Sequence, residues 1–207
     1  MNRYLIIIFI VFSLVYNGYS QEYLTPVSKA GIQQYIKLFN GLEETTVVQY
    51  ITSKSWYSPY YGFRITKDDN LYEIKYIEDS YGYFFMETDK LFRTIHPNVN
   101  MPINQKRLYM NPEFAITIQK LFLAATDTMT TRPRSFPCDG VNSIFIANGE
   151  DKILRAGSIG CPSNDIEVLI IICDRIFKMI VDGKVEDKDL KKEMEILIEK
   201  MNAGKGQ

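Results

Sequence analysis

The sequence predicts an α+β domain: an antiparallel β-sheet, made of a meander and a C-terminal hairpin, with about four helices packed mainly on one face. Two observations lead to this class. Short β-branched and aromatic runs with brief connections fill much of the first half of the chain, and brief connections favour antiparallel neighbours. In the second half, two runs with helical periodicity flank a strong hairpin signal.

Residues 1–20 have the features of a cleavable secretory signal peptide. Arg3 supplies a positive charge, Tyr4–Tyr16 is an apolar core of signal length, and Gly18-Tyr19-Ser20 places small residues at the cleavage positions. We therefore expect a secreted or periplasmic protein whose single α+β domain spans residues 21–207. An uncleaved membrane anchor is the alternative, and the short apolar core disfavours it.

The charge balance bounds the partners that the protein can have. The chain carries 24 Lys and Arg against 25 Asp and Glu. This near-neutrality gives no electrostatic case for binding nucleic acid or an anionic membrane. After signal cleavage we expect no membrane span, and the sequence leaves the oligomeric state open.

Four segments have helical spacing or helix-start signals. Asn111 and Pro112 open the second of them, and either Asp187 or Asp189 caps the last. The apolar run Val168–Cys173 also fits a buried strand, but its length and flanks favour a helix. The expected helices are Ser28–Phe39, Pro112–Met129, Asp165–Val181 and a last one that runs through Met201.

The expected strands are short and separated by turn residues. Lys67–Asn70 reads as a four-residue hairpin loop, and residues 95–105 as an exposed excursion. The predicted strands are Thr46–Thr52, Tyr61–Thr66, Leu71–Ile77, Gly82–Glu87, Lys106–Met110, Val141–Ala147 and Lys152–Ser158.

The last two strands form a hairpin with a cysteine at each foot. Asn148-Gly149 is a strong turn signal, and a regular hairpin centred on Asn148–Asp151 places Cys138 opposite Cys161. Opposed residues lie within disulfide range, and an exported protein meets an oxidising space. We expect a Cys138–Cys161 disulfide; two buried thiols are the alternative.

Motifs for catalysis and metal binding are not found. His96 is the single histidine, without ligands at zinc spacing, and a Cys–His nucleophile conflicts with bridged cysteines. Phosphate-binding loops and a nucleophile elbow are absent from the sequence. Cys173 lies in the most apolar run and reads as a buried, inert thiol. We therefore assign no catalytic residue, metal ligand or cofactor.

An aromatic cluster is the candidate binding surface. Trp56, Tyr57, Tyr60 and Tyr61 combine large rings with polar tips, which suit a glycan or a protein partner. The alternative is that these rings cover one face of the meander and fill the space between sheet and helices.

Two stretches resemble a group of small exported Gram-negative bacterial proteins. SWYSPYYGFRITKDDNLYEIKYI, at Ser55–Ile77, is similar to the group's SPSF-x-PEYGLRI strand region. FAITIQKLFLAATDT, CDGVNSIFIANG and GCPSNDIEVLIIICDRI are similar to its second half, a helix, a DG-strand hairpin and a long helix. Tyr60 stands where the group usually has an acidic residue, and many members lack the cysteines. The group has no assigned activity, so the resemblance implies a fold and export but no mechanism.

These observations favour a non-enzymatic protein that binds a protein or glycan of the bacterial envelope. One alternative is a periplasmic immunity protein that neutralises a toxin. Another is an envelope hydrolase that uses dispersed carboxylates together with His96.

Overall fold

The computed structural model of the chain describes residues 24–27, 39, 45–53, 60–69, 71–79, 103–129, 142–149, 154–159 and 164–204. Within these ranges the strands are β1 (Thr25–Pro26), β2 (Thr46–Ser53), β3 (Tyr60–Asp68), β4 (Leu71–Asp79), β5 (Ile103–Met110), β6 (Asn142–Asn148) and β7 (Leu154–Ile159), and the helices are α5 (Pro112–Asp127), α6 (Asn164–Val181) and α7 (Lys188–Ala203). The expected strand Gly82–Glu87 and all but the last residue of the expected helix Ser28–Phe39 lie outside the described residues.

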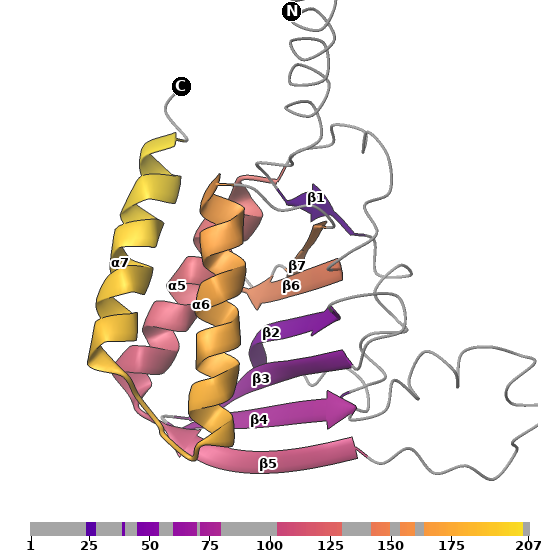
Figure 1. Cartoon of the computed structure of the whole chain (residues 1–207). Coiled ribbons are helices and arrows are strands. Elements are labelled where there is room, and N and C mark those ends of the chain that lie inside the picture. The colour runs from indigo at the N-terminus through magenta and orange to yellow at the C-terminus, as the bar shows by residue number, and fades with distance from the viewer. Residues whose placement is uncertain are drawn as a thin grey trace, which may run out of the picture.

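The strands form one antiparallel sheet in the order β1-β7-β6-β2-β3-β4-β5 (Figure 1). β2, β3, β4 and β5 are successive neighbours, which confirms the predicted meander. The β6–β7 hairpin continues this sheet because β6 pairs with β2. The two-residue strand β1 pairs with β7 and was not predicted, since so short a strand has no periodicity to detect.

The three described helices lie together on one face of the sheet, with their axes across the strands (Figure 1). The α+β class with helices on one face is therefore confirmed, although the number expected was about four. Val168–Cys173 lies inside α6, so the apolar run is a helix. Asp187 caps α7 by accepting hydrogen bonds from the backbone N–H groups of Asp189 and Leu190. None of the described helices is long and apolar enough to cross a membrane.

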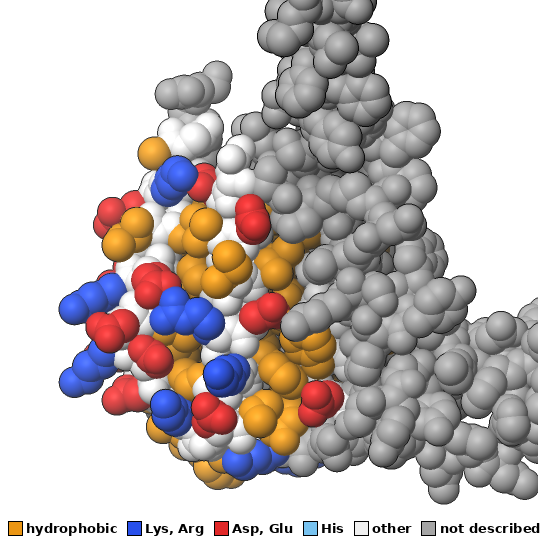
Figure 2. Space-filling model, in the orientation of Figure 1, with side chains coloured by type: hydrophobic (Ala, Val, Ile, Leu, Met, Phe, Trp, Pro, Cys, Tyr) orange, Lys and Arg blue, Asp and Glu red, His pale blue; other side chains and the backbone are white. Residues whose placement is uncertain are grey.

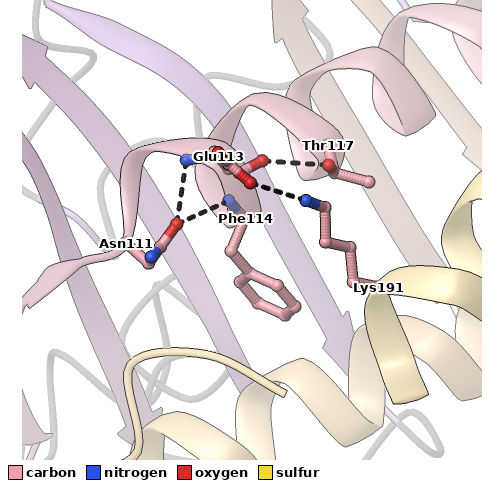
Figure 3. Close-up of polar contacts among 5 residues, drawn as sticks. All are labelled: Asn111, Glu113, Phe114, Thr117 and Lys191. Atoms are coloured by element: carbon pink, nitrogen blue, oxygen red, sulfur yellow. Dashed lines mark hydrogen bonds and ion pairs between the residues drawn. The ribbon is translucent and has the colours of Figure 1, made fainter. Parts of the chain in front are cut away.

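The start of α5 also joins this helix to α7 (Figure 3). The Asn111 side chain accepts hydrogen bonds from the backbone N–H groups of Glu113 and Phe114, at 2.9 and 3.2 Å, as its capping role predicts. Lys191 of α7 donates to the Glu113 carboxylate at 2.9 Å. The cap and this ion pair tie the start of α5 to the first turn of α7.

Two loops differ from their predictions. Asp68 pairs with Leu71, so the β3–β4 turn has two central residues and not four. Asp69 adopts the left-handed conformation (φ 49°) that such tight hairpin turns require. The predicted excursion at residues 95–105 is wrong at its end, because residues 103–105 already belong to β5.

The β6–β7 hairpin has a different register from the predicted one. A hairpin that opposes Cys138 and Cys161 pairs Ser143 with Ala156, whereas the structure pairs Ser143 with Ile159. Asn148, which was expected in the turn, is the last paired residue of β6, and its partner is Leu154 in place of Asp151. The connection between the two strands is therefore longer than predicted. Both cysteines lie outside the described residues. The symmetry argument for their disulfide is thus wrong, and the disulfide itself stays a prediction.

Both faces of the sheet are buried near its centre. On the helix face, four aromatic rings pack with centroids 5.2–6.1 Å apart: Tyr50, Phe63, Phe122 and Phe145. The opposite face, which we call the far face, buries another apolar set: Ile51, Ile77, Ile144 and Ile146. β2 is accordingly buried along its whole length, which explains why its sequence does not alternate between polar and apolar residues.

Gly62 tests how closely β2 and β3 pack. A Cβ atom at this position would lie 2.0 Å from the Tyr50 carbonyl oxygen and 3.0 Å from the Ile51 Cα atom. Backbone atoms cannot move aside as a flexible side chain can. We expect Gly62→Ala to lower the free energy of unfolding by about 3 kcal/mol in urea titrations. Gly204→Ala, which meets nothing within 4 Å, should be nearly neutral; equal effects would contradict this packing.

Candidate functional site

The predicted aromatic surface is only partly within the described residues. Trp56 and Tyr57 lie outside them. Tyr60 is 4% exposed on the far face, whereas Tyr61 is half-buried on the helix face. Because neighbouring strand residues point to opposite faces, Tyr60 and Tyr61 do not share one surface. His96 also falls outside the described residues.

Tyr61 instead belongs to a polar cluster between the sheet and α6, which we call the Asp174 cluster. The hydroxyl groups of Tyr50 and Tyr61 donate to the same Asp174 carboxylate oxygen, at 3.2 and 3.0 Å. The Tyr61 ring also packs against Phe177, with centroids 4.9 Å apart. For Tyr61 alone, this position matches the alternative that the rings fill the space between sheet and helices.

The Asp174 cluster also contains Thr52, Ser143 and Cys173, whose side chains are buried. The Thr52 and Ser143 hydroxyl oxygens lie 2.8 Å apart. Burial, reinforced by the Asp174 charge, raises the pKa of Tyr61, and burial likewise raises the pKa values of Tyr50 and Cys173. Protonated phenols and thiols donate hydrogen bonds but are poor nucleophiles. The Asp174 cluster therefore acts as a clamp between α6 and the sheet.

A second polar group crosses the far face of the sheet, which we call the cation row. Four cross-strand neighbours follow one another from β2 to β5: Gln49, Arg64, Lys75 and Arg107. Gln49 and Arg64 are buried, Lys75 nearly so, and Arg107 is exposed at the edge. Three cations thus occupy neighbouring positions on this face, and Glu73 on the same face pairs with the last of them, Arg107.

Arg64 is held firmly within the cation row. Its Nε atom donates to the Gln49 side-chain oxygen at 2.8 Å, and its guanidinium group lies 4.7 Å from the centre of the Phe39 ring. The Gln49 Nε2 atom is buried and has no hydrogen-bond partner among the described residues. This arrangement uses the planar fork of arginine for both a hydrogen bond and a cation–π contact.

The exposed end of the cation row adjoins two large apolar side chains. Tyr109 is 68% exposed and Leu71 is 60% exposed, both on the far face near the edge strand. Arg107 lies two residues before Tyr109 and pairs with Glu73 at 3.5 Å. Lys106 points to the helix face, where its ammonium group lies 3.5 Å from the Val181 carbonyl oxygen. We call the far-face residues Leu71, Arg107 and Tyr109 the β5 surface.

The helix side of the molecule also exposes apolar side chains (Figure 2). Ile171 on α6 and Ile196 on α7 are 51% and 66% exposed. They lie on helices that two ion pairs join, Arg175–Glu193 and Asp165–Lys200. Figure 2 shows charged side chains interspersed among the hydrophobic ones on these helices. This mixture is typical of an ordinary solvated helix face.

Asp174, the cation row and the β5 surface are not evident from the sequence patterns. Asp174 interrupts the most apolar run of the chain, and that interruption was a usable signal. The cation row depends on strand register, which the sequence of separate strands does not specify. Tyr109 lies in a strand that was predicted, but its place at the sheet edge depends on the strand order.

Comparisons with known proteins add no functional information. No family model matches the chain, and no match was found among curated proteins or solved structures. Among the described residues, no group of three or more His, Cys, Asp or Glu side chains could hold a metal ion.

Tyr61→Phe tests the Asp174 cluster through its pH dependence. The folded chain keeps the Tyr61 hydroxyl protonated, while the unfolded chain ionises near pH 10, so stability should fall as pH rises above about 10. At pH 7 we expect Tyr61→Phe to lose about 1 kcal/mol of unfolding free energy. Between pH 9 and 11 the variant should lose stability less steeply than the wild type. Tyr109→Phe is the exposed control, and an unchanged slope in Tyr61→Phe would refute the assignment.

Arg64→Lys tests the cation row. A lysine ammonium keeps the charge but cannot reproduce both the Gln49 hydrogen bond and the contact with Phe39. We expect a loss of about 2 kcal/mol in urea unfolding, in the range for hydrogen bonds to charged groups. Arg107→Lys, at the exposed end of the row, should change stability by less than about 0.5 kcal/mol. A tolerated Arg64→Lys would mean that charge alone matters there.

Proposed function

We propose that the protein is an exported, non-enzymatic binding protein that engages a partner protein of the bacterial envelope through the β5 surface. The single observation that carries this proposal is the exposure of Tyr109 on an edge strand, beside Leu71 and Arg107. Tyrosine and arginine are enriched in protein interfaces, where a few such side chains carry most of the binding energy.

The chemistry of the described clusters supports binding over catalysis. The Asp174 cluster consists of groups that are already hydrogen-bonded to one another, and two of them hold protons that burial makes hard to remove. The cation row is buried at Arg64 and reaches solvent only at Arg107. Of these groups, the β5 surface alone combines exposure, aromatic area and charge.

Export, which this proposal includes, is supported by the signal-like residues 1–20. An envelope location brings the β5 surface into contact with periplasmic and outer-membrane proteins. A protein partner is favoured over a glycan because Tyr109 lies on a strand edge, where a partner can use main-chain hydrogen bonds as well as side-chain contacts.

The test compares two variants that each remove one exposed side chain, Tyr109 (68% exposed) or Ile196 (66% exposed). Purified wild-type protein, Tyr109→Ser and Ile196→Ser are each immobilised and offered an envelope extract of the source organism, and captured proteins are quantified by mass spectrometry. We expect at least one protein to bind the wild type and Ile196→Ser with similar strength. Its affinity for Tyr109→Ser should fall about thirtyfold, which corresponds to loss of one interface hot spot.

Two results of this capture experiment would contradict the proposal. If Tyr109→Ser captures the same proteins as the wild type, the β5 surface is not the binding site. If Ile196→Ser alone loses them, the α6–α7 face is the site instead. Circular dichroism and urea unfolding of both variants show whether each remains folded.

A further inference from the structure

β5 is the longer of the two edge strands of the sheet. The strand order ends with β5 on one side and with the two-residue β1 on the other, and β5 spans eight residues (Figure 1). An edge strand presents backbone N–H and C=O groups on its outer side, which is a template for another strand. β5 therefore offers more backbone for strand addition than β1 does.

The charges of β5 limit what can add to it. Its sequence, INQKRLYM, contains Lys106 and Arg107 and no acidic residue. In the β4–β5 pairing, Lys106 lies opposite Tyr76 on the helix face, and Arg107 lies opposite Lys75 on the far face. The two adjacent cations thus extend to opposite sides of the sheet at the middle of the strand.

A second copy of the chain is a poor occupant of this edge. Antiparallel pairing of two β5 strands about their centre opposes Lys106 to Lys106, Lys106 to Arg107, or Arg107 to Arg107, depending on the register. Like charges directly opposite each other destabilise a strand pair. The positions of Lys106 and Arg107 therefore act against edge-to-edge association of identical chains.

An acidic segment would be attracted to Lys106 and Arg107, whereas a second copy of β5 is repelled by them. A residue opposite Arg107 on an added strand would stand next in the cation row, beyond Arg64, Lys75 and Arg107. An acidic residue there would be next to Arg107 and would share it with Glu73, and an acidic neighbour along the strand would face Lys106. Apolar residues farther along the added strand would meet Leu108 on the helix face and Tyr109 on the far face, both accessible to solvent.

We propose that the partner presents an extended segment with two adjacent acidic residues, which adds to β5 as an eighth strand of the sheet. This inference rests on the proposed function of the β5 surface and specifies the partner's chemistry. Main-chain hydrogen bonds supply binding energy, Lys106 and Arg107 select the acidic pair, and Tyr109 and Leu108 receive the flanking apolar side chains.

The test uses a phage-displayed library of random twelve-residue peptides, selected on the wild-type protein and on the double variant Lys106→Glu, Arg107→Glu. Peptides selected on the wild type should be enriched in adjacent acidic residues flanked by β-branched or aromatic residues. Their affinity for the double variant should fall at least about tenfold, because two opposed ion pairs become repulsive. Peptides selected on the double variant should carry adjacent Lys or Arg, which also proves that the variant folds and keeps its edge.

Strand addition has a second readout. The best acidic peptide is resynthesised with N-methyl groups on alternate residues, in one version on its even positions and in another on its odd positions. Only one edge of an added strand hydrogen-bonds to β5, so one version should lose binding and the other should keep it. Equal behaviour of the two versions would mean that the peptide does not bind as a strand.

The remaining outcomes separate this inference from the proposed function. If selected peptides depend on Tyr109 but show no acidic preference, the β5 surface binds and the acidic strand is wrong. If no peptide is enriched, or the enriched peptides ignore Lys106 and Arg107, the inference is overturned whatever the envelope capture shows. A wild-type dimer in sedimentation that is abolished by Tyr109→Ser would identify a second copy as the occupant and also overturn it.

Discussion

The complete burial of β2 is the constraint on which the rest of the structure depends. β2 lies between β6 and β3, so its backbone groups are hydrogen-bonded on both sides. Its side chains are covered on both faces, although four of its eight residues are polar. A buried polar group without a partner costs free energy, so the neighbouring elements must supply partners for these side chains.

Each face of the sheet meets part of this requirement in its own way, because the Thr46 hydroxyl and the Gln49 Nε2 atom have no hydrogen-bond partner among the described residues. On the helix face, Thr52 pairs with Ser143, and α6 brings Asp174 to the hydroxyl groups of Tyr50 and Tyr61. A carboxylate in so apolar a helix would otherwise destabilise it, so the two tyrosines offset its cost. On the far face, the Gln49 side-chain oxygen accepts a hydrogen bond from Arg64, whose guanidinium group lies over the Phe39 ring. The contacts on the two faces thus fix α6 and Phe39 against the centre of the sheet.

Apart from β1, the sequence predicted each of the described strands and helices, but not the register of the β6–β7 hairpin. Helix boundaries followed from caps such as Asn111 and Asp187, whose local hydrogen bonds depend on nearby residues alone. The meander followed from short connections. The β6–β7 register differs from the one that the local Asn148-Gly149 turn signal predicts, because pairing with β2 and core packing of Phe145 also act on that hairpin. The Asp174 cluster joins α6 to strands that lie more than a hundred residues earlier. The cation row depends on the register of consecutive meander strands. Local patterns therefore did not show which residues meet in either group.

The two edges of the sheet pose different physical problems. β1 is too short to template another strand, whereas β5 has eight residues and carries the exposed ring of Tyr109. A long edge with exposed aromatic area favours indiscriminate association unless something opposes it. Lys106 and Arg107 at the middle of β5 oppose it, because two identical β5 strands would place these cations opposite one another. In the proposed complex, the charges that oppose a second copy would also favour the acidic partner, so protection and selectivity would have one cause.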